Sequence, residues 1–122
     1  MTVGDYILVV EDDFDIREAL IQILEEEGYA VRGAANGQEA LDVAAAEPVP
    51  KLILLDLMMP VMNGWQFRAE QMKDPRLAPV PVLLISADPQ VQPKAEKLGV
   101  AALLKKPISL DELLAAVKSH LP

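Results

Sequence analysis

The sequence predicts an α/β fold: a doubly wound, five-stranded parallel sheet with helices on both faces. Short apolar runs alternate along the chain with longer segments whose apolar residues recur at helical spacing. The runs are apolar at consecutive positions, which is typical of parallel strands covered on both faces. Five such strand–helix repeats imply right-handed crossovers, and 122 residues are enough for one domain, residues 1–122.

The first half of the chain supplies two strands and two helices. The run "YILVV" predicts a strand over 6–10, and apolar spacing predicts a helix over 15–27. Gly28 is a typical residue to follow the end of a helix. A second strand over 29–34 and a helix over 36–47 follow, and the helix ends before a proline-rich segment.

The second half continues the alternation. The expected elements are a strand over 52–56, a helix over 63–73, a strand over 80–86, a short helix over 94–99, a strand over 100–105 and a helix over 109–121. Ser109 and Glu112 form a capping-box pattern at the start of the last helix. Pro93 is tolerated only in a first turn, so the helix after it should be short.

Composition and charge exclude several classes of function. The net charge of −8 disfavours a non-specific nucleic-acid surface, which needs a basic stripe. The lack of Cys excludes disulfide scaffolds, thiolate zinc sites and thiol redox chemistry. No signal peptide is recognisable, and no run approaches the length of about 18 apolar residues that a transmembrane helix needs. We therefore expect a cytoplasmic domain with no direct nucleic-acid or membrane partner.

Polar residues stand where the apolar strands stop. They are Glu11, Asp12 and Asp13 after the first strand, Asp56 after the third, Ser86 after the fourth, and Lys105 and Lys106 after the fifth. The carboxyl ends of parallel strands share one edge of a sheet, so these side chains should converge there. A pair of like charges about 4 Å apart costs roughly 1 kcal/mol in water and about 4 kcal/mol at a partly buried site, so the acids need a compensating partner. No glycine-rich loop follows the first strand, which disfavours a dinucleotide.

Four motifs in order carry a resemblance to a known family. They are Glu11-Asp12, "LLDLMMPVMNG" at 54–64, "LLISAD" at 83–88 and "KKP" at 105–107. The chain resembles, over essentially its whole length, the receiver domain of two-component response regulators, the family of the chemotaxis response regulator. The resemblance implies the (βα)5 flavodoxin-like receiver fold with strand order 2-1-3-4-5.

The resemblance also implies a phosphorelay site. Mg²⁺ would be bound by Asp12, Asp56 and the backbone carbonyl of Met58, with Glu11 holding a metal-bound water. Asp56 would accept a phosphoryl group from the phosphohistidine of a sensor kinase or a histidine phosphotransfer protein, forming an aspartyl phosphate. Lys106 would neutralise charge on the phosphoryl oxygens, and Ser86 would donate its hydroxyl to one of them.

Phosphorylation would then act as a switch in signal transduction. The added charge should draw Ser86 inward and shift the surface of the fourth helix, fifth strand and fifth helix, which would signal to a downstream protein or a covalently linked output domain. The family usually has an aromatic switch residue where this chain has Leu103, which puts that coupling in doubt. Met58 and Asp88 occupy positions that tune the lifetime of the aspartyl phosphate in the family.

Several residues have simpler interpretations. Asp13 and Asp15 fit helix capping and dipole complementarity better than metal binding. The methionines around Met58 lack the Cys or His partners of a soft-metal site, and Trp65 is expected to pack or to lie partly at the surface. His120, the only histidine, is expected to be solvated at a helix end, so a Ser-His-Asp site is not available.

Three functions compete at this point. The leading one is a phosphoacceptor switch whose only chemistry is self-phosphorylation and dephosphorylation, not a metabolic enzyme. The second is a receiver fold that signals by protein contact alone, which the intact set of acids, Ser86 and Lys106 disfavours. The third is an aspartyl-phosphate hydrolase, which usually has an Asp where this chain has Met58. The kinase, the target, the oligomeric state, and whether the chain stands alone or is part of a longer regulator stay open.

Overall fold

The sheet has the predicted architecture. A computed structural model describes residues 6–46, 48–56, 64–86 and 99–121. Its five strands are all parallel, in the order β2-β1-β3-β4-β5. Their bounds are β1 Tyr6–Val10, β2 Ala30–Ala34, β3 Leu52–Asp56, β4 Val82–Ser86 and β5 Ala102–Lys105. The strand order reverses beside β1, so the edge beyond β1 and β3 is where a doubly wound sheet places its site.

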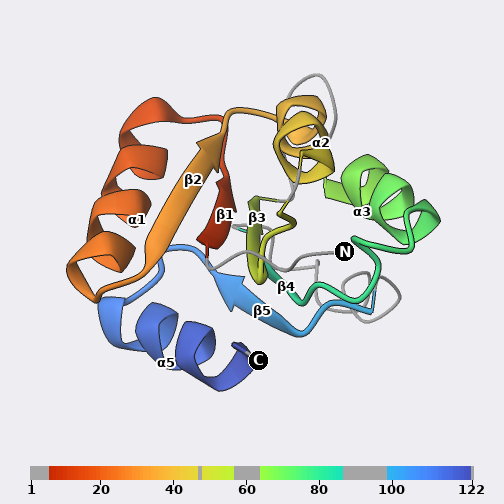
Figure 1. Cartoon of the computed structure of the whole chain (residues 1–122). Coiled ribbons are helices and arrows are strands. Elements are labelled where there is room, and N and C mark those ends of the chain that lie inside the picture. Colours follow the sequence, from red (N-terminus) through yellow and green to blue (C-terminus); the bar gives the residue numbers. More distant parts are fainter. Residues whose placement is uncertain (1–5, 47, 57–63, 87–98, 122) are drawn as a thin grey trace.

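Four helices of the described part of the chain cover the two faces of the sheet (Figure 1). They are α1 Phe14–Glu26, α2 Gly37–Ala45, α3 Gly64–Lys73 and α5 Leu110–His120. In Figure 1, α1 and α5 lie on one side of the sheet and α2 and α3 on the other. The predicted helix over 94–99 lies outside the described residues except for Gly99.

Three of these helices have an N-cap residue whose side-chain oxygen accepts a hydrogen bond from the backbone. Asp13, Asn36 and Ser109 are the N-caps of α1, α2 and α5, and each accepts a hydrogen bond from a backbone N–H three residues later. The capping prediction is confirmed for Asp13 and Ser109. Gly28, just past α1, has a φ of +94°, a conformation that glycine adopts without strain.

Three strands begin later than predicted, and β2, expected over 29–34, starts one residue late at Ala30. The segment expected to form a strand over 80–86 pairs only from Val82, and the one expected over 100–105 pairs from Ala102. Pro81 has no N–H to donate to a ladder, although its carbonyl still accepts from Ile53 N–H at 3.0 Å. The apolar run therefore starts before the paired strand does.

The sheet separates two apolar layers. Alternate residues of the three central strands point to opposite faces, so Leu8 and Ile53 pack with Phe67 of α3, while Val9 and Leu54 pack on the α1/α5 side. All residues of β1, β3 and β4 are buried. This burial explains why their sequences are apolar at nearly every position instead of every second one.

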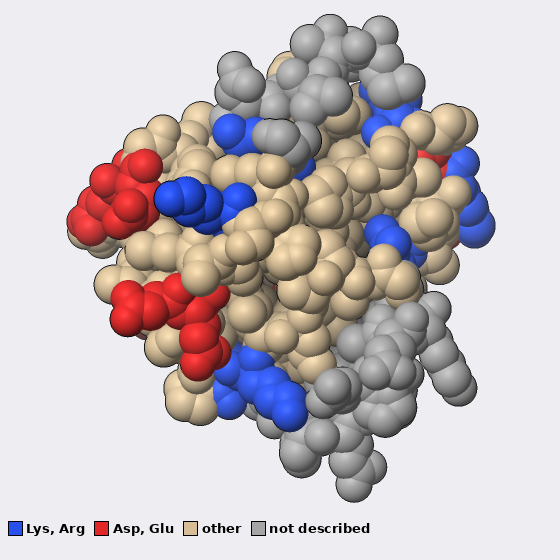
Figure 2. Space-filling view, turned by 90° about the horizontal axis from the view of Figure 1, so that it is seen from below, with Lys and Arg blue, Asp and Glu red and all other residues tan. Residues whose placement is uncertain are grey.

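Charge is unevenly distributed on the surface. Figure 2 shows one face on which acidic side chains gather at one side, while Lys and Arg stand in separate groups. None of the described helices has the length and apolar character needed to cross a membrane.

Candidate functional site at the carboxyl edge of the sheet

The predicted site residues meet at one edge of the sheet. Glu11 follows β1, Asp56 ends β3, Ser86 ends β4 and Lys106 follows β5. The ladder between β3 and β4 pairs Asp56 with Ile85, directly before Ser86, and the next ladder pairs Ser86 with Lys105. Parallel register therefore brings together residues that are up to 95 positions apart in the chain.

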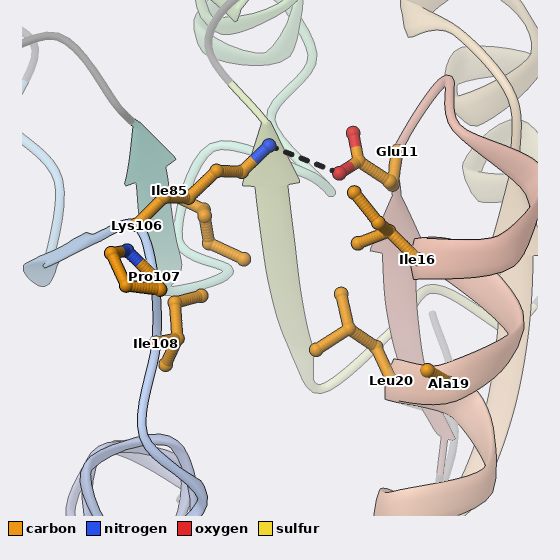
Figure 3. A pocket seen from close by; sticks show the side chains of 8 residues that line it. All are labelled: Glu11, Ile16, Ala19, Leu20, Ile85, Lys106, Pro107 and Ile108. Atoms are coloured by element: carbon orange, nitrogen blue, oxygen red, sulfur yellow. Dashed lines mark hydrogen bonds and ion pairs between the residues drawn. The ribbon is translucent and has the colours of Figure 1, made fainter.

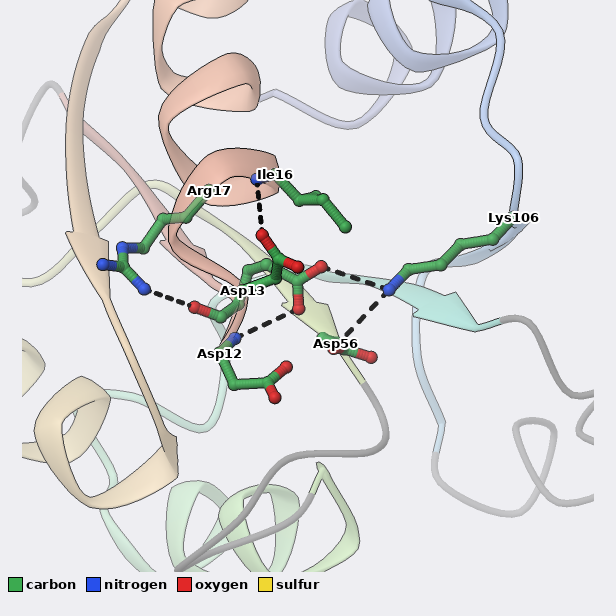
Figure 4. A network of polar contacts seen from close by, with 7 residues as sticks. Asp12, Asp13, Ile16, Arg17, Asp56 and Lys106 are labelled. Carbon is green, nitrogen blue, oxygen red and sulfur yellow. Dashed lines mark hydrogen bonds and ion pairs between the residues drawn. The ribbon is translucent and has the colours of Figure 1, made fainter.

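Three carboxylates form a compact cluster (Figure 4). One oxygen atom from each of Glu11, Asp12 and Asp56 lies within 4.8 Å of the others. Glu11 and Asp56 are only 2% and 5% exposed, whereas Asp12 is exposed to solvent. The cluster is thus closed on the side of the sheet and open on the side of Asp12.

Lys106 spans the two buried acids. Its Nζ lies 3.1 Å from Glu11 Oε1 and 3.6 Å from Asp56 Oδ2 (Figure 4). The neighbouring Lys105 is exposed, so the geometry supports the choice of Lys106 over Lys105 that the resemblance suggested. The Lys106–Pro107 peptide bond is cis.

The charges of the site do not balance. Burial, a hydrogen bond with Asp56 and the charge of Asp56 raise the pKa of Glu11 to about 8, although Lys106 opposes the shift. Burial lowers the pKa of Lys106, but its hydrogen bond with Glu11 and the charges of Asp56 and Glu11 outweigh this, so the net shift is upward. One ammonium therefore faces more negative charge than it compensates, and the cluster favours a further cation or a proton.

The donor set fits a hard cation. All three groups offer oxygen, and Mg²⁺ is bound by oxygen ligands, commonly one or two carboxylates with waters and phosphate oxygens completing an octahedron. The remaining predicted ligand, the carbonyl of Met58, lies outside the described residues, as does Asp88. The described part of the site supplies three of the four groups that were predicted to hold the metal.

The loop between β1 and α1 is held in place by two hydrogen bonds to the backbone of Glu11. Glu11 N–H donates to the Ala34 carbonyl of β2 at 3.0 Å, and Arg17 Nη1 donates to the Glu11 carbonyl at 2.8 Å. Asp13 Oδ1 accepts from Ile16 N–H, so Asp13 caps α1 instead of joining the acid cluster. Sequence reasoning missed Arg17, because on α1 it reads as an ordinary exposed helical arginine.

An apolar groove opens beside the acids (Figure 3). Its volume is about 490 Å³, and it lies between α1, the end of β4 and the segment after β5. The lining residues are Glu11, Ile16, Ala19, Leu20, Ile85, Lys106, Pro107 and Ile108. Among the lining residues, Ile16 is exposed on the first turn of α1. The groove was not predicted from the sequence, because its walls come from three separate segments.

The other residues singled out from the sequence lie away from the cluster. Asp15 is exposed on α1, and Trp65 is half-buried against the α2/α3 layer, as expected. Leu103 is half-buried against the same layer. The expectation of a solvated His120 needs correction: its ring is half-buried, and Nδ1 lies 2.8 Å from the Ala116 carbonyl one turn earlier.

Comparison with known proteins identifies the family. The family model described as "Response regulator receiver domain" matches residues 7–118. The chain belongs to the response regulator receiver domain family. The receiver fold and its strand order were therefore predicted correctly from the sequence.

Curated receiver relatives fall into two kinds by length. Sporulation initiation phosphotransferase F of Bacillus subtilis is 32% identical over 119 residues, which cover 98% of this chain and 95% of that protein. Transcriptional regulatory protein PdtaR of Mycobacterium tuberculosis is 34% identical over 113 residues, 92% of this chain but 54% of that protein. The chain thus spans nearly all of the first and about half the length of the second.

Solved receiver structures match the whole chain. Chemotaxis protein CheY4 of Vibrio cholerae has a TM-score of 0.87 and 28% identity, covering 99% of this chain and 100% of that one. Response regulator TrrA of Thermotoga maritima, solved in complex with Mg²⁺-BeF, has a TM-score of 0.85 and 31% identity, covering 97% and 100%.

Proposed function

We propose that this receiver domain is a Mg²⁺-dependent phosphoacceptor of a two-component system, with Asp56 as the residue that becomes phosphorylated. The observation that carries the proposal is the arrangement around Asp56. Its carboxylate is buried at the end of β3, lies beside two other acids and is 3.6 Å from the Lys106 ammonium. A nucleophile so placed is poised for phosphoryl transfer, which depends on positioning and charge neutralisation.

The transfer itself is a simple displacement. A carboxylate oxygen of Asp56 attacks the phosphorus of a phosphohistidine, the P–N bond breaks, and the electron pair leaves with the donor imidazole. Lys106, now shared between Glu11 and Asp56, is the protein's own cation for the phosphoryl oxygens. Ser86, at the neighbouring strand end, is our candidate for a hydroxyl donor to the phosphorylated site.

Mg²⁺ would supply the positive charge that Lys106 alone does not provide. Glu11, Asp12 and Asp56 are the described residues that would hold it, directly or through water, with the Met58 carbonyl as a fourth ligand by family resemblance. The Mg²⁺-BeF complex of the Thermotoga relative supports the choice of metal. Transfer from a protein donor would leave one phosphoryl group per chain, which the domain would lose only through its own dephosphorylation, and this is the behaviour of a cytoplasmic switch rather than of a metabolic enzyme.

The apolar groove is our candidate docking face for the phosphohistidine donor, a sensor kinase or a histidine phosphotransfer protein. Lys106 lines it, and so does the exposed apolar side chain of Ile16 on α1. We expect Ile16→Glu to impair phosphotransfer from a protein donor while leaving phosphorylation by acetyl phosphate unchanged. The output surface would be β5 and α5 together with the segment between Ser86 and Gly99, and would contact a downstream protein or a linked domain.

Intact-mass measurement after incubation with acetyl phosphate and Mg²⁺ tests the proposal. One added phosphoryl group is expected in the wild-type protein, and none in Asp56→Asn or in the presence of a chelator. Asp15→Asn is the matched control, because it removes an exposed acid outside the cluster and should be phosphorylated normally. An adduct that persists in Asp56→Asn would refute the assignment, and no adduct in the wild type would favour a module that acts by protein contact alone.

A further inference from the structure

The backbone on the two sides of Glu11 is held from β2, through the Glu11 N–H, and from α1, through the Glu11 carbonyl. The Glu11 carbonyl, which accepts from Arg17 Nη1 at 2.8 Å, belongs to the peptide unit that joins Glu11 to Asp12 (Figure 4). A peptide unit is planar, so fixing its oxygen also fixes the direction of the Asp12 N–H, which donates to Glu11 Oε2 at 3.1 Å. Arg17 therefore acts on both acids through one peptide.

Gly33 on β2 makes room for the Arg17 side chain. A Cβ atom at Gly33 would lie 2.9 Å from Ile21 Cδ1, 3.3 Å from Arg17 Cδ and 3.6 Å from Arg17 Cγ. Carbon atoms prefer a separation of about 3.5–4.0 Å, so the first two contacts are too short. Gly33 is not among the positive-φ glycines, so its backbone does not require glycine. A side chain at Gly33 would press on the end of the Ile21 side chain and on the stem of Arg17, which would have to move by a few tenths of an ångström.

We infer that Arg17 is a positioning residue for the metal-binding acids, and that the bare backbone of Gly33 allows its side chain to reach the Glu11 carbonyl. The inference deepens the proposed Mg²⁺-dependent function and rests on it. Arg17 need not touch the metal or the phosphoryl group. It would keep the Glu11–Asp12 peptide in place against the mutual repulsion of the acids.

Metal sites are sensitive to this kind of support. Mg²⁺ demands nearly ideal octahedral geometry, and ligand carboxylates must be held within about 0.5 Å of it. Loss of an outer partner that orients a ligand typically costs about 10–100-fold in metal affinity. Loss of the hydrogen bond from Arg17 to the Glu11 carbonyl should therefore weaken Mg²⁺ binding more than it destabilises the fold.

The first test is Mg²⁺ affinity, measured by isothermal titration calorimetry on metal-free protein. Arg17→Met keeps much of the apolar stem but cannot donate, and we expect the dissociation constant for Mg²⁺ to rise about tenfold. Arg17→Lys keeps a charged donor and should recover most of the affinity. Arg32→Met is the matched control, because Arg32 adjoins Gly33 in sequence but stacks on the Tyr6 ring at 4.3 Å.

A second test separates positioning from general damage. At saturating Mg²⁺, Arg17→Met should be phosphorylated by acetyl phosphate at close to the wild-type maximal rate, with only the Mg²⁺ requirement increased. Gly33→Ala should also weaken Mg²⁺ binding, and in an Arg17→Ala background it should add little, because the stem it displaces is gone.

Several results would overturn the inference. Unchanged Mg²⁺ affinity in folded Arg17→Met would do so, as would an equal loss in Arg32→Met or a maximal rate that stays low at saturating Mg²⁺. If Arg17→Met does not fold, Mg²⁺ affinity is compared in Arg17→Lys and Gly33→Ala instead. A wild-type affinity for Mg²⁺ in Gly33→Ala would refute the role of Gly33. Wild-type protein that binds no Mg²⁺ would overturn the proposed function as well, whereas binding that is insensitive to Arg17 would overturn this inference alone.

Discussion

Two buried polar clusters, one on α3 and one at the carboxyl edge of the sheet, differ in how their charges are met. On the α2/α3 side, buried Arg68 donates to Gln71 Oε1 at 2.8 Å and to the Gly99 carbonyl at 3.0 Å. Gln71 Nε2 in turn donates to the carbonyls of Leu77 and Val80. At the carboxyl edge, Glu11 and Asp56 both form ion pairs with Lys106, and Asp12 lies beside these two acids.

The first cluster uses backbone carbonyls that the fold itself holds in place, so it stabilises the connection between α3 and the segments around it. The second cluster gathers more like charge than its own cation compensates, which costs folding free energy unless something binds. In the first cluster the donors meet carbonyl oxygens of the fold, which indicates a structural role, whereas the surplus negative charge of the second indicates a candidate site. Four predictions test this contrast, in order of decreasing expected effect.

The largest effect is expected at Lys106. Lys106→Met removes the ammonium that lies 3.1 Å from Glu11 and 3.6 Å from Asp56. Loss of one preorganised charge-stabilising donor typically costs about 10²–10³-fold in rate. We expect phosphorylation by acetyl phosphate, followed by intact mass, to slow by about 100-fold. Arg68→Met is the matched control from the other cluster, and a comparable loss of rate there would contradict the contrast.

Gln71 is expected to matter for stability and not for the site. Gln71→Leu removes the acceptor of Arg68 Nη1 and a donor to the Val80 carbonyl, both in the buried α2/α3 layer. Each buried polar group that loses its partner costs about 1–3 kcal/mol, so we expect the free energy of unfolding to fall by about 3 kcal/mol in urea titrations. The Mg²⁺ dissociation constant should not change. A variant with normal stability but weakened metal binding would reverse the roles of the two clusters.

The pKa of Glu11 predicts a dependence of stability on pH. In the folded, metal-free protein that pKa is raised to about 8, above the ordinary 4.5, because of burial and the neighbouring Asp56. Between these values the folded state holds a proton that the unfolded state has released, so stability falls as pH rises from about 4.5 to 8. We expect a loss of about 1–3 kcal/mol over that range in urea unfolding.

Two controls accompany this pH series. Glu11→Gln should flatten the dependence, because the amide does not titrate. In the wild type, Mg²⁺ binding should displace the proton, so the affinity for Mg²⁺ should rise by up to about tenfold per pH unit below pH 8. A stability of the metal-free wild type that is constant over the same range would contradict the surplus-charge interpretation.

The smallest effect is expected at the helix caps. Asp13 and Ser109 make the same hydrogen bond to a backbone N–H at the start of α1 and α5. Alanine at either position should cost about 1 kcal/mol in the free energy of unfolding. Only Asp13→Ala should also alter Mg²⁺ affinity, because Asp13 follows the acids directly and its carbonyl accepts from Arg17 N–H. Equal effects of both variants on Mg²⁺ would show that helix stability, not local geometry, controls the site.

Local patterns in the chain were sufficient for the fold and for most of the site residues. Fully apolar strands, helical spacing and cap residues such as Ser109 depend on neighbours in sequence, so they can be read without coordinates. Strand ends in a parallel sheet share an edge, and this rule predicted that Glu11, Asp56, Ser86 and Lys106 converge. The same rule wrongly included Asp13 and Lys105, and several element bounds shifted by one or two residues.

The remaining features depend on contacts between segments that are distant in sequence. In the sequence, Arg17 is an ordinary helical arginine. Its role depends on the packing of α1 over Gly33, which brings the Arg17 side chain to the Glu11 carbonyl. The groove needs α1, β4 and the segment after β5 at one place, and the raised pKa of Glu11 needs burial beside Asp56. These properties arise from packing distance and desolvation, and neither is encoded in any short stretch of the chain.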